Sequence, residues 1–314
     1  MPELRRQNYP PLGAIICRRL IEARNLTLHK KIKMKAFLGT GLLGHGFVRA
    51  MISKGEQVQV WNRTAAKAKE LEQYGAIAFE DIAKAVNNAD VIHLALKDDA
   101  SVDDALKAAE PGIKKGAIIV DHTTTSVEGA KRRTAEWKGK GFLYQHAPVF
   151  MGPKNALEST GYMLVSGNQE HIKKLESQLS SLTGKLINFG EETGKAAAMK
   201  LTGNLFLVAF TAGIGDMLSF AHALNISKSE LSQLFDTWNP GSALPGRLKR
   251  MTSGDFSDPS WRLDMARKDT GLFIKEAEKN NATLNVIPAV AALMDEWIKK
   301  GHGKEDWTII GKVK

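Results

Sequence analysis

The stretch that decides the fold is Phe37-Leu38-Gly39-Thr40-Gly41-Leu42-Leu43-Gly44, where a short apolar run leads into glycines with G-x-G-x-x-G spacing. Gly39 permits a tight turn, Gly41 lets the backbone approach a ligand, and Gly44 lets the next helix pack closely on the strand. A helical pattern follows as far as Met51, and the free N–H groups at a helix start attract phosphate. The spacing is a weak signal alone, but between a strand and a helix it predicts a dinucleotide-binding loop.

Strands and helices continue to alternate to about residue 190. Short apolar runs predict strands at residues 57–61, 91–95 and 117–120, with helical spacing between them. Thr64 is expected to cap one of these helices, which Gly75 ends. Alternating strands and helices form parallel sheets through right-handed crossovers. The pattern predicts an α/β, Rossmann-type doubly wound sheet, with residues 162–165 and 186–189 continuing the supply of strands.

The pattern then becomes helical. Residues 194–224 contain no proline and keep helical spacing for longer than a typical globular helix. A capping box from Ser227 to Glu230 opens another helix. Three more helices are predicted at residues 242–251, 262–279 and 288–300. We therefore expect an α/β domain over residues 34–193 and an all-helical domain over residues 194–314, joined by the long helix.

The positive charge is concentrated at the N-terminus. The 314 residues include 44 basic and 34 acidic ones, which gives a net charge of +10. Residues 1–33 hold eight of the basic residues against two acidic ones. Such a charge can attract nucleic acid or another polyanion, but more than half of it precedes the first strand. We expect residues 1–33 to be a disordered extension or a non-native start upstream of Met34.

Composition argues against several other classes of protein. Cys17 is the only cysteine, so a disulfide framework and a cysteine-based zinc site are excluded. No run of 18 apolar residues occurs, which argues against a membrane span. His122 and His146 lack the spacing of metal ligands, so no metal is expected. These features are typical of a cytoplasmic globular protein.

The residues at the end of the second strand indicate whether the chain binds NAD or NADP. A NAD site usually carries Asp or Glu there to bind the ribose 2′-hydroxyl. This chain has Asn62, Arg63 and Thr64 and no carboxylate. Arg63 can pair with a 2′-phosphate and stack on adenine, while Asn62 and Thr64 can donate hydrogen bonds. NADP is therefore the expected cofactor, and the alternative is that Arg63 is merely a solvated surface residue.

Four motifs resemble those of the β-hydroxyacid dehydrogenases, the family of 3-hydroxyisobutyrate dehydrogenase and of tartronate semialdehyde and glyoxylate reductases. They are the glycine loop; Asp121-His122-Thr123-Thr124, similar to D-x-S-T; Ala147-Pro148-Val149 with Gly152, similar to A-P-V-S-G-G; and Gly194 with Lys200 and Asn204, similar to G-x-x-x-x-x-K-x-x-x-N. Lys268-Asp269 and Asp306-Trp307 also look like late features of the family. The resemblance implies a C-terminal domain similar to that of 6-phosphogluconate dehydrogenase and a homodimer or homotetramer.

The chemistry of hydride transfer supports the same residues. Converting an alcohol to a carbonyl, or the reverse, requires a group that takes or gives the hydroxyl proton. Lys200 and Asn204 are four residues apart and share a helix face. Burial would lower the pKa of the lysine towards working pH. We expect Lys200 to be the general acid/base and Asn204 to orient it and the substrate, and the resemblance implies the same role for the lysine.

Further candidates lie at strand ends and in the helical domain. The Thr123 hydroxyl suits a substrate carboxylate, although residues 123–126 can instead simply cap the next helix. Lys268 is expected to close the cleft from the helical domain and contact cofactor or substrate, unless it forms only an i, i+4 surface pair. The remaining candidates are Thr40, Leu42, Leu43, Leu96, Lys97 and Asp99 for the cofactor, and Thr124, Phe150, Met151, Gly152 and Asn204 for the substrate.

The substrate end departs from the family's pattern. Phe150-Met151 replaces a Ser-Gly pair, which removes a hydroxyl and makes the pocket more apolar and crowded. Lys97 replaces a usual proline, Asp99 a usual Ser or Thr, and His146 a usual Asp. These changes leave hydride chemistry intact but put small polar hydroxyacid substrates in doubt.

Three functions are compatible with these features. The leading hypothesis is an NADP-dependent oxidoreductase acting on a small β-hydroxyacid or semialdehyde. Imine reduction is the second, favoured by Phe150-Met151, but imine reductases that resemble this family usually carry Asp or Tyr where Lys200 stands. The third is a silent dinucleotide fold whose basic N-terminal arm binds nucleic acid, which the retention of Lys200 argues against. A small-molecule substrate is expected, with neither nucleic acid nor a membrane as partner.

Overall fold

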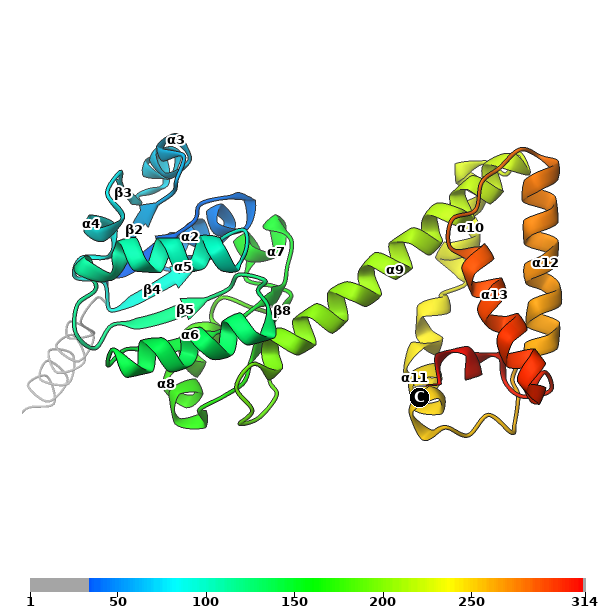
Figure 1. Cartoon of the computed structure of the whole chain (residues 1–314). Coiled ribbons are helices and arrows are strands. Elements are labelled where there is room, and N and C mark those ends of the chain that lie inside the picture. Colours follow the sequence, from blue (N-terminus) through cyan, green and yellow to red (C-terminus); the bar gives the residue numbers. More distant parts are fainter. Residues whose placement is uncertain (1–33, 313–314) are drawn as a thin grey trace, which may run out of the picture. The chain divides into compact units, whose positions relative to one another are not determined.

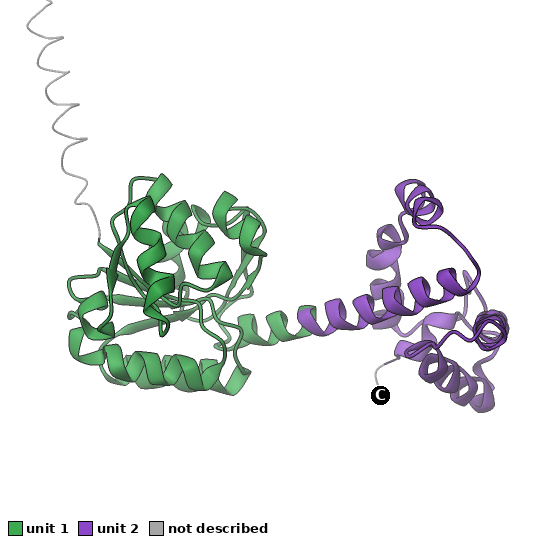
Figure 2. Cartoon of the chain, turned by 90° about the horizontal axis from the view of Figure 1, so that it is seen from above, with its two compact units in different colours: residues 1–203 green, residues 204–314 purple. Residues whose placement is uncertain are grey.

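A computed structural model describes residues 34–312, so the predictions for residues 1–33 lie outside the described residues. The chain divides into two compact units, residues 1–203 and residues 204–314 (Figure 2). The expected domain boundary was at the start of the long helix, whereas the two units divide within that helix.

The first unit is built on a six-stranded sheet in which every neighbouring pair is parallel (Figure 1). The strand order is β3-β2-β1-β4-β5-β6. The strands are β1 (Lys35–Leu38), β2 (Val58–Trp61), β3 (Ile77–Phe79), β4 (Val91–Leu94), β5 (Ile118–Asp121) and β6 (Leu143–His146). The order reverses direction between β1 and β4, which creates a topological switch point. The predicted Rossmann-type fold is confirmed.

Alternation along the strands gives this sheet two apolar faces. In β1, Phe37 packs on one face, whereas Ala36 and Leu38 pack on the other. The helices of the connections are α2 (Leu42–Ser53), α3 (Ala65–Lys69), α4 (Ile82–Val86), α5 (Asp99–Ala109) and α6 (Val127–Gly139). Helix α2 contributes apolar side chains to the face of Phe37, and α4 and α5 contribute to the opposite face. Both faces are therefore covered, as a parallel sheet requires.

Side-chain caps fix where several of these helices begin. Asp81, Asp98 and Ser126 accept hydrogen bonds from backbone N–H groups at the starts of α4, α5 and α6. Thr64 stands at the N-cap position of α3 as expected, but its side chain makes no capping hydrogen bond. A 3₁₀ helix (Glu70–Tyr74) continues α3 and ends at Gly75, whose φ of 101° is left-handed.

The last strands of the unit form a second sheet instead of extending the first. It contains β7 (Val149–Phe150), β8 (Tyr162–Val165) and β9 (Lys185–Asn188) in that order. Strand β7 runs antiparallel to β8, and β9 runs parallel to it. The connections contain α7 (Pro153–Glu158) and α8 (Gln169–Ser180). Apolar spacing predicted the strands at 162–165 and 186–189 but carries no information about which sheet they join.

The long helix α9 (Lys195–Ala223) begins in the first unit and continues into the second. By length and composition it is apolar enough to cross a membrane. The sequence criterion of 18 uninterrupted apolar residues missed this property, because the helix is interrupted by small and polar residues. Several of its large apolar side chains are exposed, including Leu205, Val208 and Phe210.

The second unit continues with helices α10 (Lys228–Thr237), α11 (Leu244–Ser253), α12 (Leu263–Lys279) and α13 (Ile287–Trp297). The capping box at the start of α10 is present, since Ser227 and Glu230 bond each other's backbone N–H groups. A small core of Phe256, Leu263, Ala266, Met294 and Ile309 lies between these elements. No strand longer than an isolated bridge occurs among residues 204–312.

Candidate active site

A cleft of about 750 Å³ lies at the carboxyl ends of β1, β2, β4 and β5, where the strand order reverses. Its lining includes most of the predicted ligand-binding residues, namely Gly39, Gly41, Leu42, Leu43, Gly44, Asn62, Arg63, Thr64, Leu96, Lys97, Thr123, Thr124, Met151 and Lys200. A hollow of about 820 Å³ lies elsewhere, against α6 and α8, and contains none of the predicted site residues. The smaller cleft is therefore the candidate active site.

The glycine loop has the geometry that a diphosphate requires. Gly39 has a φ of 95°, and a Cβ there would lie 2.4 Å from the Ala95 carbonyl oxygen. A Cβ on Gly44 would lie 2.0 Å from the Gly39 carbonyl oxygen, so close packing of α2 depends on this glycine. Nothing lies within 4 Å of the Cβ position of Gly41, the N-cap of α2. The loop thus leaves space in front of the helix N-terminus, where a dinucleotide diphosphate fits.

The loop after β2 carries the charge that distinguishes cofactors. Asn62 Oδ1 accepts a hydrogen bond from Thr40 N at 3.1 Å, and its Nδ2 donates to the Thr64 carbonyl at 3.0 Å. Asn62 therefore ties this loop to the glycine loop. Arg63 is exposed at the rim of the cleft, and Lys67, one turn later, also lines it. Sequence reasoning missed Lys67, although its spacing from Arg63 was a usable signal.

Lys200, on the first turns of α9, also lines the cleft. It is only 8% exposed, and burial lowers the pKa of its ammonium group. Its Nζ lies 4.1 Å from the centre of the Phe150 ring. That ring occupies space over Gly203, where a Cβ would come within 2.3 Å of it. The lysine is thus held beside an aromatic face, an arrangement that favours the charged form against burial.

Two predicted residues belong to the second unit. Asn204 follows Lys200 by one turn of α9, so the shared helix face is present. Lys268 lies on α12, is half exposed, and pairs with the neighbouring Asp269 at 2.9 Å. That pair joins adjacent residues, whereas an i, i+4 pair was the expected alternative.

Among the predicted site residues of the first unit, Thr40, Asp99, Phe150 and Gly152 do not line the cleft. The Asp99 carboxylate pairs with Arg133 at 2.6 Å and accepts a hydrogen bond from Ser126 N at 2.8 Å. Gly152 is the N-cap of α7 and donates to Asn155 Oδ1. Asp99 and Gly152 were assigned from their places in family motifs, and a motif does not show whether a residue faces the cleft.

Two buried histidines, His93 and His122, lie beside each other at the cleft. His122, which lines the cleft, contacts His93 through a 3.0 Å hydrogen bond between His122 Nε2 and His93 Nδ1. His122 Nδ1 donates to the Ala147 carbonyl, so its Nε2 must accept from His93. Burial lowers the pKa of His122 to about 4 and that of His93 well below its usual value. Both rings are therefore neutral at pH 7.

A glycine loop at the switch point of a doubly wound sheet, with a buried lysine in the same cleft, defines a nicotinamide-dependent oxidoreductase. Residues 35–190 match the NAD-binding domain of 6-phosphogluconate dehydrogenase, and residues 194–313 match the domain described as NAD-binding of NADP-dependent 3-hydroxyisobutyrate dehydrogenase. The chain belongs to the 3-hydroxyisobutyrate dehydrogenase family of β-hydroxyacid dehydrogenases and is an NAD(P)-dependent oxidoreductase.

Individual relatives differ in the names of their reactions. The chain is 25% identical to 3-sulfolactaldehyde reductase of Escherichia coli over 281 residues, which cover 88% of this chain and 93% of that one. It is 28% identical to the NADPH-dependent reductive aminase of Aspergillus oryzae over 284 residues, covering 85% and 92%. An imine reductase from Myxococcus stipitatus in complex with NADP⁺ has the same fold, with a TM-score of 0.82, 22% identity and coverage of 88% and 98%.

Proposed function

We propose that this protein transfers a hydride between NADPH and the carbonyl carbon of a small semialdehyde, or between a β-hydroxyacid and NADP⁺, with Lys200 as general acid/base. The observation that carries the proposal is the burial of Lys200 in the cleft that also contains the glycine loop. The bound nicotinamide supplies or accepts the hydride. In reduction the Lys200 ammonium donates a proton to the developing alkoxide oxygen, and in oxidation the neutral amine accepts the hydroxyl proton.

Replacing Lys200 by Ala tests this role. Without the proton donor we expect turnover to fall by about 10²-fold or more, the usual contribution of general acid–base catalysis, while NADPH affinity stays within about twofold because the glycine loop is intact. Turnover is measured as NADPH consumption with a panel of semialdehydes, glyoxylate and cyclic imines. NADPH affinity is measured by fluorescence titration. Undiminished turnover in the variant contradicts the proposal.

The pH dependence of wild-type turnover provides a second readout. The pKa of Lys200 is lowered by burial. Reduction needs the ammonium form, so its rate should fall as pH rises through this lowered pKa, whereas oxidation should accelerate over the same range. An alkaline limb that persists in the Lys200→Ala variant contradicts the assignment.

We propose NADP as the preferred cofactor because Arg63 and Lys67 place two cations at the cleft rim and the β2 end carries no carboxylate. Arg63→Ala should weaken NADPH binding about tenfold or more and leave NADH binding nearly unchanged, since only NADPH has a 2′-phosphate. Both affinities are measured by fluorescence titration. Equal affinity of the wild type for NADH and NADPH contradicts the preference.

Imine reduction is a second candidate, and the position of Phe150 favours it. Its ring lies against Lys200 and Gly203, which gives the cleft-lining lysine an apolar neighbour less suited to a charged substrate. The reductive aminase and imine reductase relatives agree with this candidate, while Lys200 is more typical of the hydroxyacid enzymes. In the substrate panel, NADPH consumption with cyclic imines but not with semialdehydes identifies this activity.

We propose a homodimer or homotetramer in the cytoplasm, with a small-molecule substrate and without nucleic acid or a membrane as partner. The exposed apolar side chains of α9 support an interface with a second copy. A silent protein whose residues 1–33 bind nucleic acid is the remote alternative. A salt-sensitive gel shift that disappears when residues 1–33 are deleted would identify it.

A further inference from the structure

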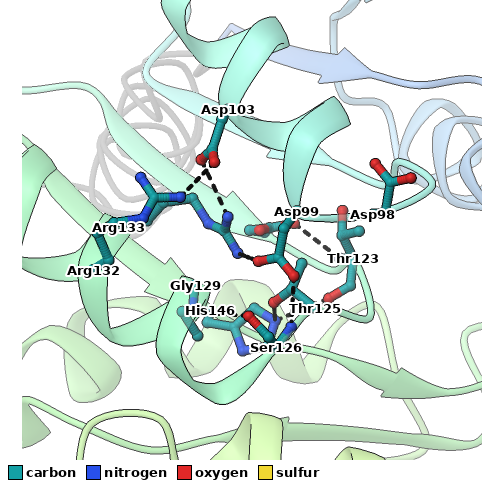
Figure 3. Close-up of polar contacts among 12 residues, drawn as sticks. Asp98, Asp99, Asp103, Thr123, Thr125, Ser126, Gly129, Arg132, Arg133 and His146 are labelled. Carbon is teal, nitrogen blue, oxygen red and sulfur yellow. Dashed lines mark hydrogen bonds and ion pairs between the residues drawn. The ribbon is translucent and has the colours of Figure 1, made fainter.

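A closed circuit of side-chain hydrogen bonds surrounds the loop between β5 and α6, residues 122–126. Arg133 Nη2 bonds Asp99 Oδ1 at 2.6 Å, and Asp99 Oδ2 accepts from Ser126 N at 2.8 Å (Figure 3). On the other side, Arg133 Nε donates to the Tyr144 hydroxyl at 3.0 Å, and that hydroxyl donates to Asp121 Oδ2 at 2.6 Å. Asp121 flanks the loop at one end and Ser126 closes it at the other. We name this set of residues the Arg133 circuit.

Thr123, which lies in the enclosed loop, is held at three points. Its N–H donates to Asp121 Oδ1 at 2.9 Å, and its carbonyl accepts from His146 Nε2 at 2.9 Å. Its Oγ1 accepts from Leu96 N at 3.0 Å, which joins the loop to the end of β4. Because Oγ1 is the acceptor in its bond with Leu96 N, the Thr123 hydroxyl can still donate its hydrogen to a ligand. Thr123 lines the cleft that also contains Lys200.

The circuit lies in the protein interior, where burying a charged guanidinium costs free energy. The Arg133 side chain is fully buried, as is Asp121. Burial alone would lower the pKa of the Arg133 guanidinium, but Tyr144, Asp99 and Asp121 raise it above its usual value. A buried ion pair is weak evidence for stability, and its best-attested use is to select one conformation. The conformation selected here is that of the loop carrying Thr123.

The packing around Asp99 is specific to this arrangement. A Cβ on Gly129 would lie 1.8 Å from Asp99 Oδ1, so the carboxylate reaches Arg133 only because residue 129 has no side chain. Hydrogen bonds and the Arg133 charge hold the pKa of Asp99 below its usual value although burial opposes them. The residue is therefore an ionised member of the circuit at neutral pH.

We propose that Arg133, Asp99 and Tyr144 are positioning residues that fix the Thr123 hydroxyl in the cleft, so that it donates a hydrogen bond to a carboxylate or carbonyl oxygen of the substrate. This proposal rests on the proposed function for the identity of the substrate. It assigns Asp99 to the loop and not to the cofactor. The residues act through Thr123 and touch neither substrate nor cofactor.

A double-mutant cycle tests whether the circuit acts through Thr123. Tyr144→Phe removes one hydroxyl from the circuit and keeps the ring, and Thr123→Ala removes the hydroxyl that is positioned. We expect each single variant to lower kcat/KM for the substrate about tenfold, a loss appropriate to one hydrogen bond. The NADPH Kd should stay within about twofold of the wild-type value. In the Thr123→Ala background, Tyr144→Phe should have almost no further effect. Additive losses overturn the proposal.

Arg132→Gln is the matched control. Arg132 neighbours Arg133 on α6 and also pairs with Asp103, but it is exposed and lies outside the circuit. It should leave kcat/KM within about twofold of the wild type. If Arg132→Gln lowers kcat/KM as much as Tyr144→Phe does, the proposal is overturned. That result would show that weakening any contact between α6 and α5 has the same effect.

Hydrogen exchange of the Thr123 and Ser126 amides gives a readout without a substrate. Both amides donate within the circuit. Gly129→Ala displaces the Asp99 carboxylate without removing a charge. In this variant and in Tyr144→Phe, amide exchange at residues 123–126 should be at least fivefold faster than in the wild type. Exchange in Arg132→Gln should match the wild type. Unchanged exchange overturns the positioning role. Faster exchange supports it even if no compound in the substrate panel is turned over, a result that would count against the proposed function instead.

Discussion

At the scale of single residues, the candidate site depends on how one lysine is accommodated in an apolar environment. Lys200 loses hydration on burial, and the Phe150 ring restores part of the stabilisation of its charge. Gly203 makes this possible because the ring lies where its Cβ would be. Gly203, by its lack of a side chain, therefore links the Lys200 motif to Phe150, the residue that departs from the family's pattern.

Gly203→Ala tests this link. The added methyl group would lie 2.3 Å from the ring, so Phe150 must move away from Lys200. Overpacking of this kind costs about 1–3 kcal/mol, and we expect a lower Tm together with a severalfold lower kcat. Gly213→Ala on the same helix is the control, because nothing lies within 4 Å of its Cβ position. It should leave kcat unchanged and stabilise slightly through helix propensity; equal effects at the two positions contradict the link.

At the scale of secondary-structure elements, β4, β5 and α8 are joined by a buried chain of hydrogen bonds. Gln178 on α8 donates to His93 on β4, which donates to His122 after β5. The two imidazoles also stack on each other and near Phe37. In this series of hydrogen bonds one ring nitrogen of each histidine accepts, so both imidazoles must be neutral. The packing of the three elements therefore depends on pH.

Acid should therefore destabilise the protein through these histidines. The folded-state pKa of His122 is about 4, below the value of 6.5 that applies when it is solvated. The unfolded chain then binds more protons below pH 6.5, so the stabilisation is present above that pH and is lost as pH falls towards 4. Between pH 7 and pH 5 the loss from His122 alone is about 2 kcal/mol.

Denaturant unfolding at pH 7 and pH 5 measures this loss. A double variant with His93→Gln and His122→Gln, which keeps hydrogen-bonding groups without titrating, should lose less free energy of unfolding between the two pH values than the wild type. Equal losses in the two proteins contradict the assignment of the acid sensitivity to this pair.

The elements that sequence patterns predicted are those with regular apolar spacing. Strands at 57–61, 91–95 and 117–120 and the helix at 194–224 are present within a few residues. Strand β6 was missed because it buries Tyr144, Gln145 and His146, whose polar groups break the apolar pattern. The glycine loop could be located from the sequence because its function depends on local backbone geometry. The Arg133 circuit could not, because its members are brought together only by the tertiary fold.

At the scale of the whole chain, the second unit has a small apolar core and many exposed apolar side chains. Its main buried cluster contains five residues, whereas large side chains such as Trp238, Leu248 and Leu272 are exposed. A soluble monomer rarely leaves so much apolar surface exposed. Together with α9, this surface is suited to burial against a second copy of the chain.

Light scattering coupled to size exclusion should therefore find a dimer or tetramer at micromolar concentrations. A double variant with Val208→Glu and Leu218→Glu places charges on exposed apolar positions of α9, which are 71% and 49% exposed. We expect it to dissociate into smaller species, because charges are disfavoured in the core of an interface. Lys249→Glu on α11 is the control and should not change the assembly. A wild-type monomer, or a wild-type protein that requires detergent, contradicts this prediction.

The second sheet of the first unit has a consequence for truncation. Met163 and Val165 of β8 and Leu175 of α8 belong to the same apolar cluster as Phe37 of β1. A fragment that stops after the six-stranded sheet would keep α2 on this face but lose the apolar side chains that β8 and α8 add to the cluster, which would leave part of the face exposed to water. We therefore expect the smallest fragment that folds stably to extend through α8, and not to end with the parallel strands and their crossovers.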